Sequence, residues 1–247
     1  MKVLITGAAG FIGSQLLEAL AVQHPEWTLI ASDIRPLNPQ ALRPNVEAAL
    51  LDIGKREAVL AAVAQHQPDA IVHLASVVTP PPGMGEDVLH TIDVEGTRSI
   101  LQAAVEHGVR QLIVTSSGAA YGYYPENAEW IDEHDPLRGH SKFAYAKHKR
   151  EVEEMLAQAR VKHPELRQLI LRPGTILGRH VNNQITDMFK KKAVMGISGS
   201  DSRFVFIWDQ DVVSIIIKGL EKGCSGIFNL AGDGALSLRE IAGVLQK

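Results

Sequence analysis

The sequence predicts an α/β fold with a doubly wound parallel sheet, in which helices cover both faces. Short aliphatic or β-branched runs alternate along the chain with longer amphipathic segments. This alternation is typical of parallel strands that are joined by crossover helices. The short runs are also apolar at most positions, as strands buried on both faces must be.

Six strands and five helices can be placed in order on this pattern. The strands are predicted at residues 2–6, 28–32, 46–51, 70–74, 111–115 and 168–172. Amphipathic segments between and after them predict helices at residues 11–23, 55–65, 86–107, 141–160 and 185–191. A chain of 247 residues is long enough for one substantial core with a small lobe beside it.

The alternation becomes irregular after Gly174, which predicts a small second lobe at residues 175–247. Residues 196–202 are rich in glycine and serine, and a strand-like run follows at residues 204–207. A final helix is expected near Ser237, because its spacing to Glu240 is that of a capping box. The chain ends seven residues after Glu240, so we expect this lobe to be short and partly interwoven with the first domain.

Composition and charge exclude several classes of protein. A formal net charge of −3 without any run of Lys or Arg does not fit a nucleic-acid-binding protein. Ten histidines without HExxH spacing predict no metal site, and the single Cys224 favours a reducing, cytoplasmic location. We expect no signal peptide, because strand-like residues begin at Val3, and no membrane segment, because no apolar run is long enough.

A glycine-rich turn directly follows the first strand. Its spacing lets the chain turn tightly and bring backbone N–H groups up to a phosphate, while the next helix points its positive N-terminus at the same group. A glycine-rich turn without a ligand is the alternative. The flanking strand and helix favour a Rossmann dinucleotide-binding domain at residues 1–174. The residues of the turn are Gly7, Gly10, Phe11, Ile12 and Gly13.

An acidic residue at the end of the second strand indicates which dinucleotide binds. Asp33 lies 20 residues after Gly13, where a carboxylate can bond both ribose hydroxyls of an adenosine and repel a 2′-phosphate. The sequence therefore favours NAD over NADP. Arg35 could accept a phosphate, which keeps NADP as the weaker alternative. An ordinary turn residue is the other interpretation of Asp33.

Three side chains predict a catalytic site. Tyr145 and Lys149 are one helical turn apart, so both project from the same helix face. A lysine ammonium near a phenol lowers the tyrosine pKa from about 10 by roughly one to three units, toward the range of acid/base catalysis. Ser117 follows the fifth strand, at the sheet edge where open α/β folds bind ligands, and Ser116 and Thr115 are alternatives to it. An incidental Tyr and Lys, or hydroxyls that only cap the strand, would be the non-catalytic interpretation.

The sequence resembles an extended short-chain dehydrogenase/reductase of the NAD-dependent epimerase/dehydratase family. The resemblance covers nearly the whole chain and rests on several motifs: residues 6–13, Asp33, Asp52-Ile53, His73-Leu74-Ala75-Ser76, residues 93–97, Ser116-Ser117 before Tyr121-Gly122, Tyr145 with Lys149, and residues 171–174.

The resemblance implies a role for most of these residues. It implies Asp52 and Ile53 near the adenine, Ala75 beside the cofactor backbone, and Pro173 near the nicotinamide. Lys149 would bond the nicotinamide ribose, Tyr145 would be the acid/base, and Ser117 would orient the reacting oxygen. The expected cofactor-binding set is the glycine turn with Asp33, Arg35, Asp52, Ile53, Leu74, Ala75, Ser76, Thr115, Tyr145, Lys149 and Pro173.

Several positions depart from the family pattern. Asp93 and Thr175 stand where members commonly have asparagine, and Ser116-Ser117-Gly118 replaces the Thr-Asp-Glu triplet of the dehydratases. We therefore do not expect dehydration. The usual C-terminal lobe of the family is also longer than residues 175–247.

Three further features are the proline-rich loop, two polar residues beyond residue 174, and a histidine in the fourth strand. Residues 77–85 contain three prolines and would form either a wall over the nicotinamide or a rigid connecting loop. The family resemblance implies that Arg203 binds a substrate phosphate, with Thr175 as a second substrate-side candidate, although a solvated arginine at a strand start is the commoner alternative. His73 lies in an apolar strand and is expected to be a structural core histidine.

The leading functional hypothesis is an NAD-dependent epimerase that acts on a hydroxyl of a sugar or nucleotide-sugar by transient hydride transfer. The alternative is a simple dehydrogenase or reductase of a sugar, uronate or steroid-like alcohol. A non-enzymatic dinucleotide-sensing regulator is the third hypothesis, but it has no need of Ser117, Tyr145 and Lys149. The family resemblance also implies a homodimer through the helices at residues 86–107 and 141–160.

Overall fold

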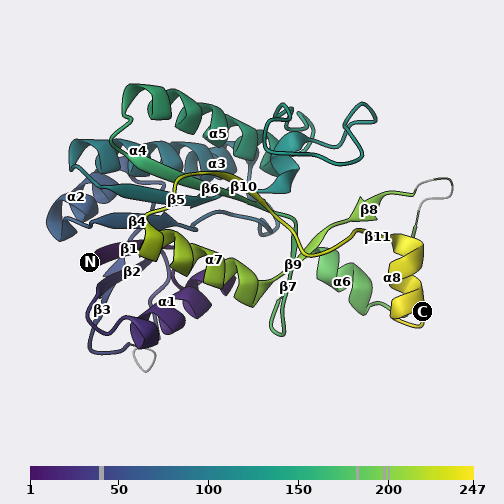
Figure 1. Ribbon diagram of the computed structural model, residues 1–247, viewed down its shortest axis with the longest axis horizontal. Helices are drawn as coiled ribbons and strands as arrows, with labels where there is room; N and C mark the ends of the chain where they lie inside the picture. Colours follow the sequence, from purple (N-terminus) through teal and green to yellow (C-terminus); the bar gives the residue numbers. More distant parts are fainter. Residues whose placement is uncertain (39–41, 182–183, 197–198, 200) are drawn as a thin grey trace.

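The protein folds around a central sheet whose strands are all parallel (Figure 1). The structure is a computed structural model, and it describes residues 1–38, 42–181, 184–196, 199 and 201–247. Within these residues the sheet has seven strands, in the order β10-β6-β5-β4-β1-β2-β3. Their bounds are β1 Lys2–Thr6, β2 Thr28–Asp33, β3 Val46–Leu50, β4 Ala70–His73, β5 Gln111–Thr115, β6 Arg167–Pro173 and β10 Gly226–Leu230. The predicted α/β fold with a doubly wound parallel sheet is confirmed.

Helices cover both faces of the sheet. Helices α1 (Phe11–Gln23) and α7 (Asp209–Lys222) pack together on one face. Helices α2 (Arg56–His66), α4 (Gly96–Glu106) and α5 (Ala144–Lys162) cover the other face (Figure 1). Within the described parts of the chain, every helix is too short or too polar to span a bilayer.

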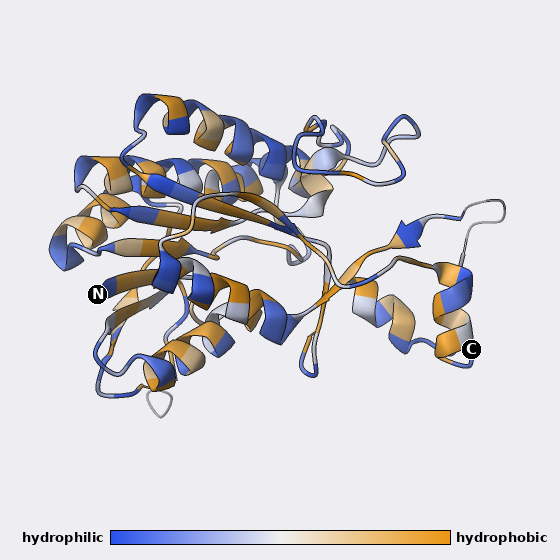
Figure 2. Ribbon diagram, viewed as in Figure 1, coloured by the Kyte–Doolittle hydropathy of each residue, from blue (hydrophilic) through white to orange (hydrophobic). Residues whose placement is uncertain are grey.

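The inner strands are mostly apolar because each faces two hydrophobic layers, whereas the edge strand β3 exposes Glu47 and Leu50. In β1, Val3 and Ile5 belong to the cluster that includes α1 and α7, whereas Leu4 belongs to the cluster under α2, α4 and α5. All three side chains are fully buried. Figure 2 shows the same pattern as apolar strands between helices whose outer surfaces are hydrophilic. Alternation along one strand therefore fills two cores.

The predicted helix at residues 86–107 contains a turn of a different kind. It begins as α3 (Glu86–His90), continues as a π-helical turn, η2 (Thr91–Glu95), and ends as α4. Helix α5, which contains Tyr145 and Lys149, begins at Ala144, three residues later than predicted, because Phe143 N–H closes a turn on the carbonyl of His140.

Two elements beyond residue 174 return to the sheet and were not predicted from the sequence. Strand β10 pairs with β6, and α7 precedes it on the α1 side. The strand expected at residues 204–207 is two short strands, β8 (Arg203–Phe204) and β9 (Phe206–Trp208). They separate because β8 pairs with β11 (Leu236–Ser237) and β9 pairs with β7 (Thr175–Leu177).

The remaining C-terminal elements project from the carboxyl edge of the sheet (Figure 1). They are α6 (Gln184–Lys190), the β8–β11 pair and α8 (Leu238–Val244). The predicted capping box is confirmed, since Ser237 Oγ accepts Glu240 N–H and the Glu240 carboxylate accepts Ser237 N–H. The predicted Gly/Ser-rich stretch at residues 196–202 lies partly outside the described residues.

His73 is a core histidine with both ring nitrogens hydrogen-bonded, as its place in an apolar strand predicted. Its Nδ1 lies 2.7 Å from Thr6 Oγ1 and its Nε2 lies 3.0 Å from Thr97 Oγ1. Thr97 donates its own proton to the carbonyl of Asp93, so Nε2–H must be the donor and Nδ1 the acceptor. Burial and the charge of nearby Lys149 lower the pKa of His73 from 6.5 to about 3.

We predict that this neutral histidine makes the fold acid-sensitive. Below pH 6.5 His73 is protonated in the unfolded chain but stays neutral in the folded protein. The free energy of unfolding therefore decreases as the pH is lowered, until the pH reaches the pKa of folded His73. The slope contributed is about 1.4 kcal/mol per pH unit. His73→Gln should be less stable at pH 7 but should show a flatter decline of the urea-unfolding free energy between pH 6 and pH 5. Equal slopes in the two proteins would contradict this explanation.

Candidate active site

The turn after β1, residues 7–13, contains three glycines and is called the cradle below. Gly7 has a φ of +72°, and a Cβ built on it would lie 2.8 Å from the backbone nitrogen of Ala75. A Cβ on Gly13 would collide with the carbonyl oxygen of Gly7, and one on Gly10 would lie 3.0 Å from the same atom. Helix α1 begins at Phe11, with Ile12 next. Side chains at these positions would clash with the backbone of the turn and of the segment after β4, so glycine keeps the turn tight. A tight turn that opens a helix fits the pyrophosphate of a dinucleotide.

Asp33 is held directly beside this turn. Its Oδ2 accepts the N–H of Ala9 at 3.0 Å, and its Oδ1 accepts the backbone N–H of Arg35 at 3.0 Å. The Arg35 guanidinium pairs with Asp33 at 3.3 Å and donates to the carbonyl of Ala9 at 2.9 Å. The Asp33 side chain is 6% exposed and that of Arg35 is 63% exposed. A carboxylate and a guanidinium thus stand together where the sequence expects the adenosine ribose.

The other expected cofactor residues lie at the carboxyl ends of the strands. Asp52 follows β3 and accepts the N–H of Gly54, and Ile53 is buried against Gly96. Leu74, Ala75 and Ser76 follow β4 directly. Thr115 ends β5, and the buried Pro173 ends β6. Because parallel strands share one carboxyl edge, these segments meet at the same side of the sheet.

The proposed catalytic trio meets at this edge. Lys149 is 7% exposed, and its Nζ donates to the carbonyl of Thr115 at 3.1 Å. The same Nζ lies 5.5 Å from the ring centre of Tyr145, in the first turn of α5. Ser117 is the N-cap of the short 3-10 helix η3 (Gly118–Tyr121), where its Oγ accepts the N–H of Ala119. That bond uses an acceptor site of Ser117 and leaves its proton available to a substrate oxygen.

Of the two hydroxyl alternatives to Ser117, Ser116 has a structural partner for its hydroxyl. Ser116 is buried and donates its hydroxyl to Glu153 on α5. The carbonyl of Thr115 binds Lys149. Ser117, by contrast, is half-buried at the start of η3.

A buried ion pair fixes α5 to the sheet. The Arg172 guanidinium donates to both oxygens of Glu153, with the shortest distance 2.6 Å, and the two side chains are 3% and 2% exposed. Burial alone would lower the pKa of Arg172, but its interactions with Glu153 and Tyr121 together outweigh burial and raise this pKa. The pair joins α5 to β6 beside Lys149.

The network continues into the segment between η3 and α5. Arg172 donates to Tyr121 Oη at 2.6 Å, and Tyr121 donates to Asn229 on β10 at 2.8 Å. The backbone of Asn229 in turn donates to Glu133 at 2.6 Å. Sequence reasoning assigned no role to Glu153. Its position four residues after Lys149 on one helix face was the available signal.

The substrate-side candidates lie beyond residue 174, Thr175 on β7 and Arg203 on β8. Thr175 begins β7, where its N–H bonds the carbonyl of Val205. Arg203 is exposed on β8 and lies 3.8 Å from Asp201. The contacts of the described residues do not join Arg203 to Ser117 or Tyr145. Residues 78–83 after β4 are exposed, so the proline-rich loop lies open at the same edge.

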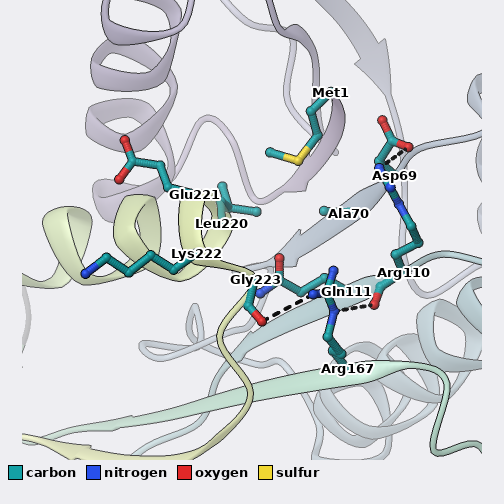
Figure 3. Close-up of a pocket in the computed structure, with 10 residues that line it drawn as sticks. All are labelled: Met1, Asp69, Ala70, Arg110, Gln111, Arg167, Leu220, Glu221, Lys222 and Gly223. Carbon is teal, nitrogen blue, oxygen red and sulfur yellow. Dashed lines mark hydrogen bonds and ion pairs between the residues drawn. The ribbon is translucent and has the colours of Figure 1, made fainter.

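A cavity of about 250 Å³ lies at the opposite, amino edge of the sheet (Figure 3). It is lined by residues that precede or begin strands, such as Asp69 and Arg110, and by the end of α7. Arg110 and Asp69 form an ion pair at 2.7 Å, and Arg167 donates to backbone carbonyls. None of the predicted site residues lines this cavity, so it is separate from the candidate active site.

Fold and site together define a Rossmann-type enzyme with a dinucleotide cradle and a Ser–Tyr–Lys trio at one sheet edge. The model of the NAD dependent epimerase/dehydratase family matches residues 3–231. The chain belongs to this family, and the resemblance read from its motifs is confirmed. NAD is the cofactor of the family, as the sequence predicted.

Curated relatives include epimerases and dehydrogenases. The chain is 32% identical over 199 residues to the N-acetyl-alpha-D-glucosaminyl-diphospho-ditrans,octacis-undecaprenol 4-epimerase of Escherichia coli O157:H7, which covers 78% of this chain and 54% of the relative. It is 35% identical over 146 residues to the uronate dehydrogenase of Pseudomonas putida, covering 59% of this chain and 51% of the relative. The chain thus spans about half the length of these two relatives.

Solved structures share the fold over the whole chain. The UDP-glucose 4-epimerase of Thermotoga maritima, solved with UDP-glucose, has a TM-score of 0.82 at 21% identity and covers 100% of this chain and 82% of its own. The UDP-glucose 4-epimerase of Thermus thermophilus, solved with NAD, has a TM-score of 0.80 at 24% identity, with 100% and 84% covered.

We predict that the Glu153–Arg172 pair is needed for folding stability. Glu153→Gln leaves a buried guanidinium without its anion, which costs about 3–5 kcal/mol. Urea unfolding measures this loss. The matched control is Glu95→Gln, which breaks the exposed Glu95–Arg98 pair and should change stability by less than about 1 kcal/mol. Equal effects of the two changes would show that the buried pair has no special role.

Proposed function

We propose that the protein is an NAD-dependent oxidoreductase/epimerase that acts on a hydroxyl of a sugar or nucleotide-sugar. The proposal rests on one observation above all: Lys149 Nζ lies 5.5 Å from the Tyr145 ring centre while it is anchored to the carbonyl of Thr115, beside Ser117. A protein that only sensed a dinucleotide would not need this trio.

The residues of the cradle would bind NAD. The N–H groups of the Gly7–Gly13 turn would bind the pyrophosphate, Asp33 the adenosine ribose, and Asp52 with Ile53 would lie near the adenine. The segments at Leu74–Ser76 and Thr115, with Pro173, would border the nicotinamide half. Lys149 would bond its ribose.

The chain's own residues supply the proton chemistry. NAD, when bound, supplies a hydride acceptor that can return the hydride. Ser117 would donate a hydrogen bond to the reacting substrate oxygen and orient it. Tyr145, as the phenolate, would take the proton of the substrate hydroxyl, and the Lys149 ammonium would stabilise the negative charge of the phenolate before that proton arrives. An epimer would form if the hydride returned to the other face of the ketone.

A simple dehydrogenase is the alternative, and the uronate dehydrogenase relative supports it. The two functions differ in their products. An epimerase converts UDP-glucose with bound NAD and accumulates no NADH, whereas a dehydrogenase releases one NADH for each uronate or sugar oxidised. Absorbance at 340 nm together with NMR of the sugar distinguishes them. The proposal would be contradicted if a panel of nucleotide-sugars, uronates and free sugars gave neither an epimer nor NADH.

The lobe beyond the sheet edge would bind the rest of the substrate. We propose that it comprises the parts of residues 175–247 that remain after α7 and β10 join the Rossmann layers. Thr175 and Arg203 are the candidates for substrate contact within it. A cytoplasmic location is proposed on the single Cys224 alone.

A homodimer through α4 and α5 is proposed from a groove between the two helices. Its lining includes the apolar Leu101, Val105 and Met155, with polar residues such as Arg98 and Lys162. A second copy of α4 and α5 would cover these apolar groups. We expect light scattering to give twice the mass of the chain, 26.9 kDa, and Val105→Asp to give the single mass. A monomeric wild type would contradict the proposal.

We predict that the protein binds NAD more tightly than NADP. The Asp33 carboxylate places negative charge where the 2′-phosphate would lie, and repulsion of this kind should favour NAD by roughly tenfold or more. Titration calorimetry with both dinucleotides measures the ratio. Asp33→Asn should reduce the preference for NAD over NADP, whereas Glu57→Gln on the exposed surface of α2 should leave this preference unchanged. NADP binding as tight as NAD in the wild type would transfer the ribose-binding role to Arg35.

We predict that Tyr145→Phe lowers turnover by roughly 10²–10⁴ and leaves NAD affinity nearly unchanged. The change removes the proton-transfer group but does not alter the glycine turn or Asp33. Lys149→Met should weaken both functions, because the ammonium is assigned to the ribose as well as to Tyr145. Ser117→Ala should mainly lower turnover.

The control for the tyrosine change is Tyr124→Phe, since Tyr124 stacks on His140 outside the proposed trio. Its turnover should match that of the wild type. Near-normal turnover of Tyr145→Phe on a substrate that the wild type accepts would refute the mechanism.

A further inference from the structure

Asp93 is a buried carboxylate that binds the segment after β4. Its side chain is 3% exposed. Oδ1 accepts the hydroxyl of Ser76 at 2.9 Å and the N–H of Val77 at 3.0 Å. Oδ2 faces Nδ1 of His148 at 3.4 Å, and the His148 side chain is 1% exposed. Among the described residues, Asp93 is the carboxylate within ion-pair distance of His148.

The backbone that carries Asp93 is unusual. Asp93 is the middle residue of the π-helical turn Thr91–Glu95. Such turns are rare, interrupt the regular hydrogen bonding of a helix, and occur often at functional sites. The Asp93 carbonyl also accepts Thr97 Oγ1, so that both ends of the residue are fixed. The π-helical turn therefore fixes the position of the Asp93 carboxylate, although it interrupts the regular hydrogen bonding of the α-helix.

His148 is also held in an unfavourable setting. Its Nε2 is buried without a hydrogen-bond partner among the described residues. An unsatisfied buried polar atom costs free energy that a leucine of similar size would not lose. Nearby charges are paired elsewhere: His90 contacts Glu151 at 2.9 Å, and Lys147 contacts Glu86 at 3.0 Å. Asp93 is therefore the hydrogen-bond partner that the described residues offer to the buried imidazole.

The pair stands between the two halves of the candidate active site. On one side, Ser76 and Val77 continue from Ala75, whose backbone touches Gly7 of the cradle. On the other side, His148 precedes Lys149 and lies three residues after Tyr145 on α5. The contacts run from the cradle through the segment after β4 to Asp93, then through His148 to the catalytic helix.

We propose that Asp93 and His148 form a positioning pair that sets the spacing between the dinucleotide cradle and the Lys149–Tyr145 helix. Neither residue touches the reacting atoms. Asp93 aligns the backbone at Ser76 and Val77 through its hydrogen bonds. Its contact with His148 then fixes the position of that backbone relative to Lys149. The proposal deepens the proposed function and depends on it for the role of Lys149, but its nucleotide-binding test does not need a substrate.

The test compares NADH affinity with folding stability in two variants. His148→Leu removes the ring nitrogen that faces Asp93 and should raise the Kd for NADH by roughly tenfold or more, as loss of a hydrogen bond to a charged group does. His148→Asn restores an N–H donor near the Nδ1 position and should return the Kd to within about threefold of wild type. NADH fluorescence titration measures the Kd, and urea unfolding measures stability. His66→Leu, on α2 far from this edge, is the matched control.

A second variant covers the case in which His148→Leu does not fold. Asp93→Asn/His148→Leu leaves no buried carboxylate unpaired, keeps an oxygen for Val77 N–H, and should bind NADH as weakly as His148→Leu is expected to. Wild-type NADH affinity in either folded variant would overturn the positioning role. No NADH binding by the wild type would instead refute the proposed function, so the two failures are distinguishable.

Discussion

The buried pair of Glu153 and Arg172 is the constraint on which the candidate site depends. It ties α5 to the end of β6, and Glu153 also receives the hydroxyl of Ser116 at the end of β5. Tyr145, Lys149 and Glu153 recur every four residues, so fixing Glu153 against the sheet presents the other two along the same edge. A buried ion pair of this kind adds little net stability over an apolar pair. It does, however, require one relative position of the two side chains, since each buried charge must face its partner.

Polar groups are buried mainly where the strands end. The chain from Thr6 through His73 to Thr97, the Asp93–His148 pair and the Glu153–Arg172 pair all lie at or near the carboxyl edge. Each buried polar group costs free energy unless it is bonded, and a bonded network rigidifies its surroundings. The edge is thereby made rigid in the region where hydride transfer would demand accurate placement. The strand middles are apolar and serve packing.

The order of the strands explains why distant segments meet. From β1 the chain runs outward to β2 and β3, then crosses to β4 and runs the other way to β5, β6 and β10. Binding sites in open α/β sheets form at such a reversal, because the loops on either side diverge and leave a crevice. The glycine cradle after β1 and the Ala75 segment after β4 border this reversal directly. Ser117 follows β5, the strand next to β4.

The sequence by itself determined what depends on local pattern. Apolar runs predicted six of the sheet strands, glycine spacing predicted the cradle, and the four-residue step from Tyr145 to Lys149 predicted a shared helix face. Tertiary structure alone decided what depends on partners distant in sequence. Strand β10 contains Gly226 and Asn229 and is a strand because β6 offers it an edge. Glu153 and His148 read as ordinary helix residues until Arg172 and Asp93 are placed opposite them. Side-chain periodicity is encoded within a few residues, whereas the partner of a buried charge is set by how the whole chain packs.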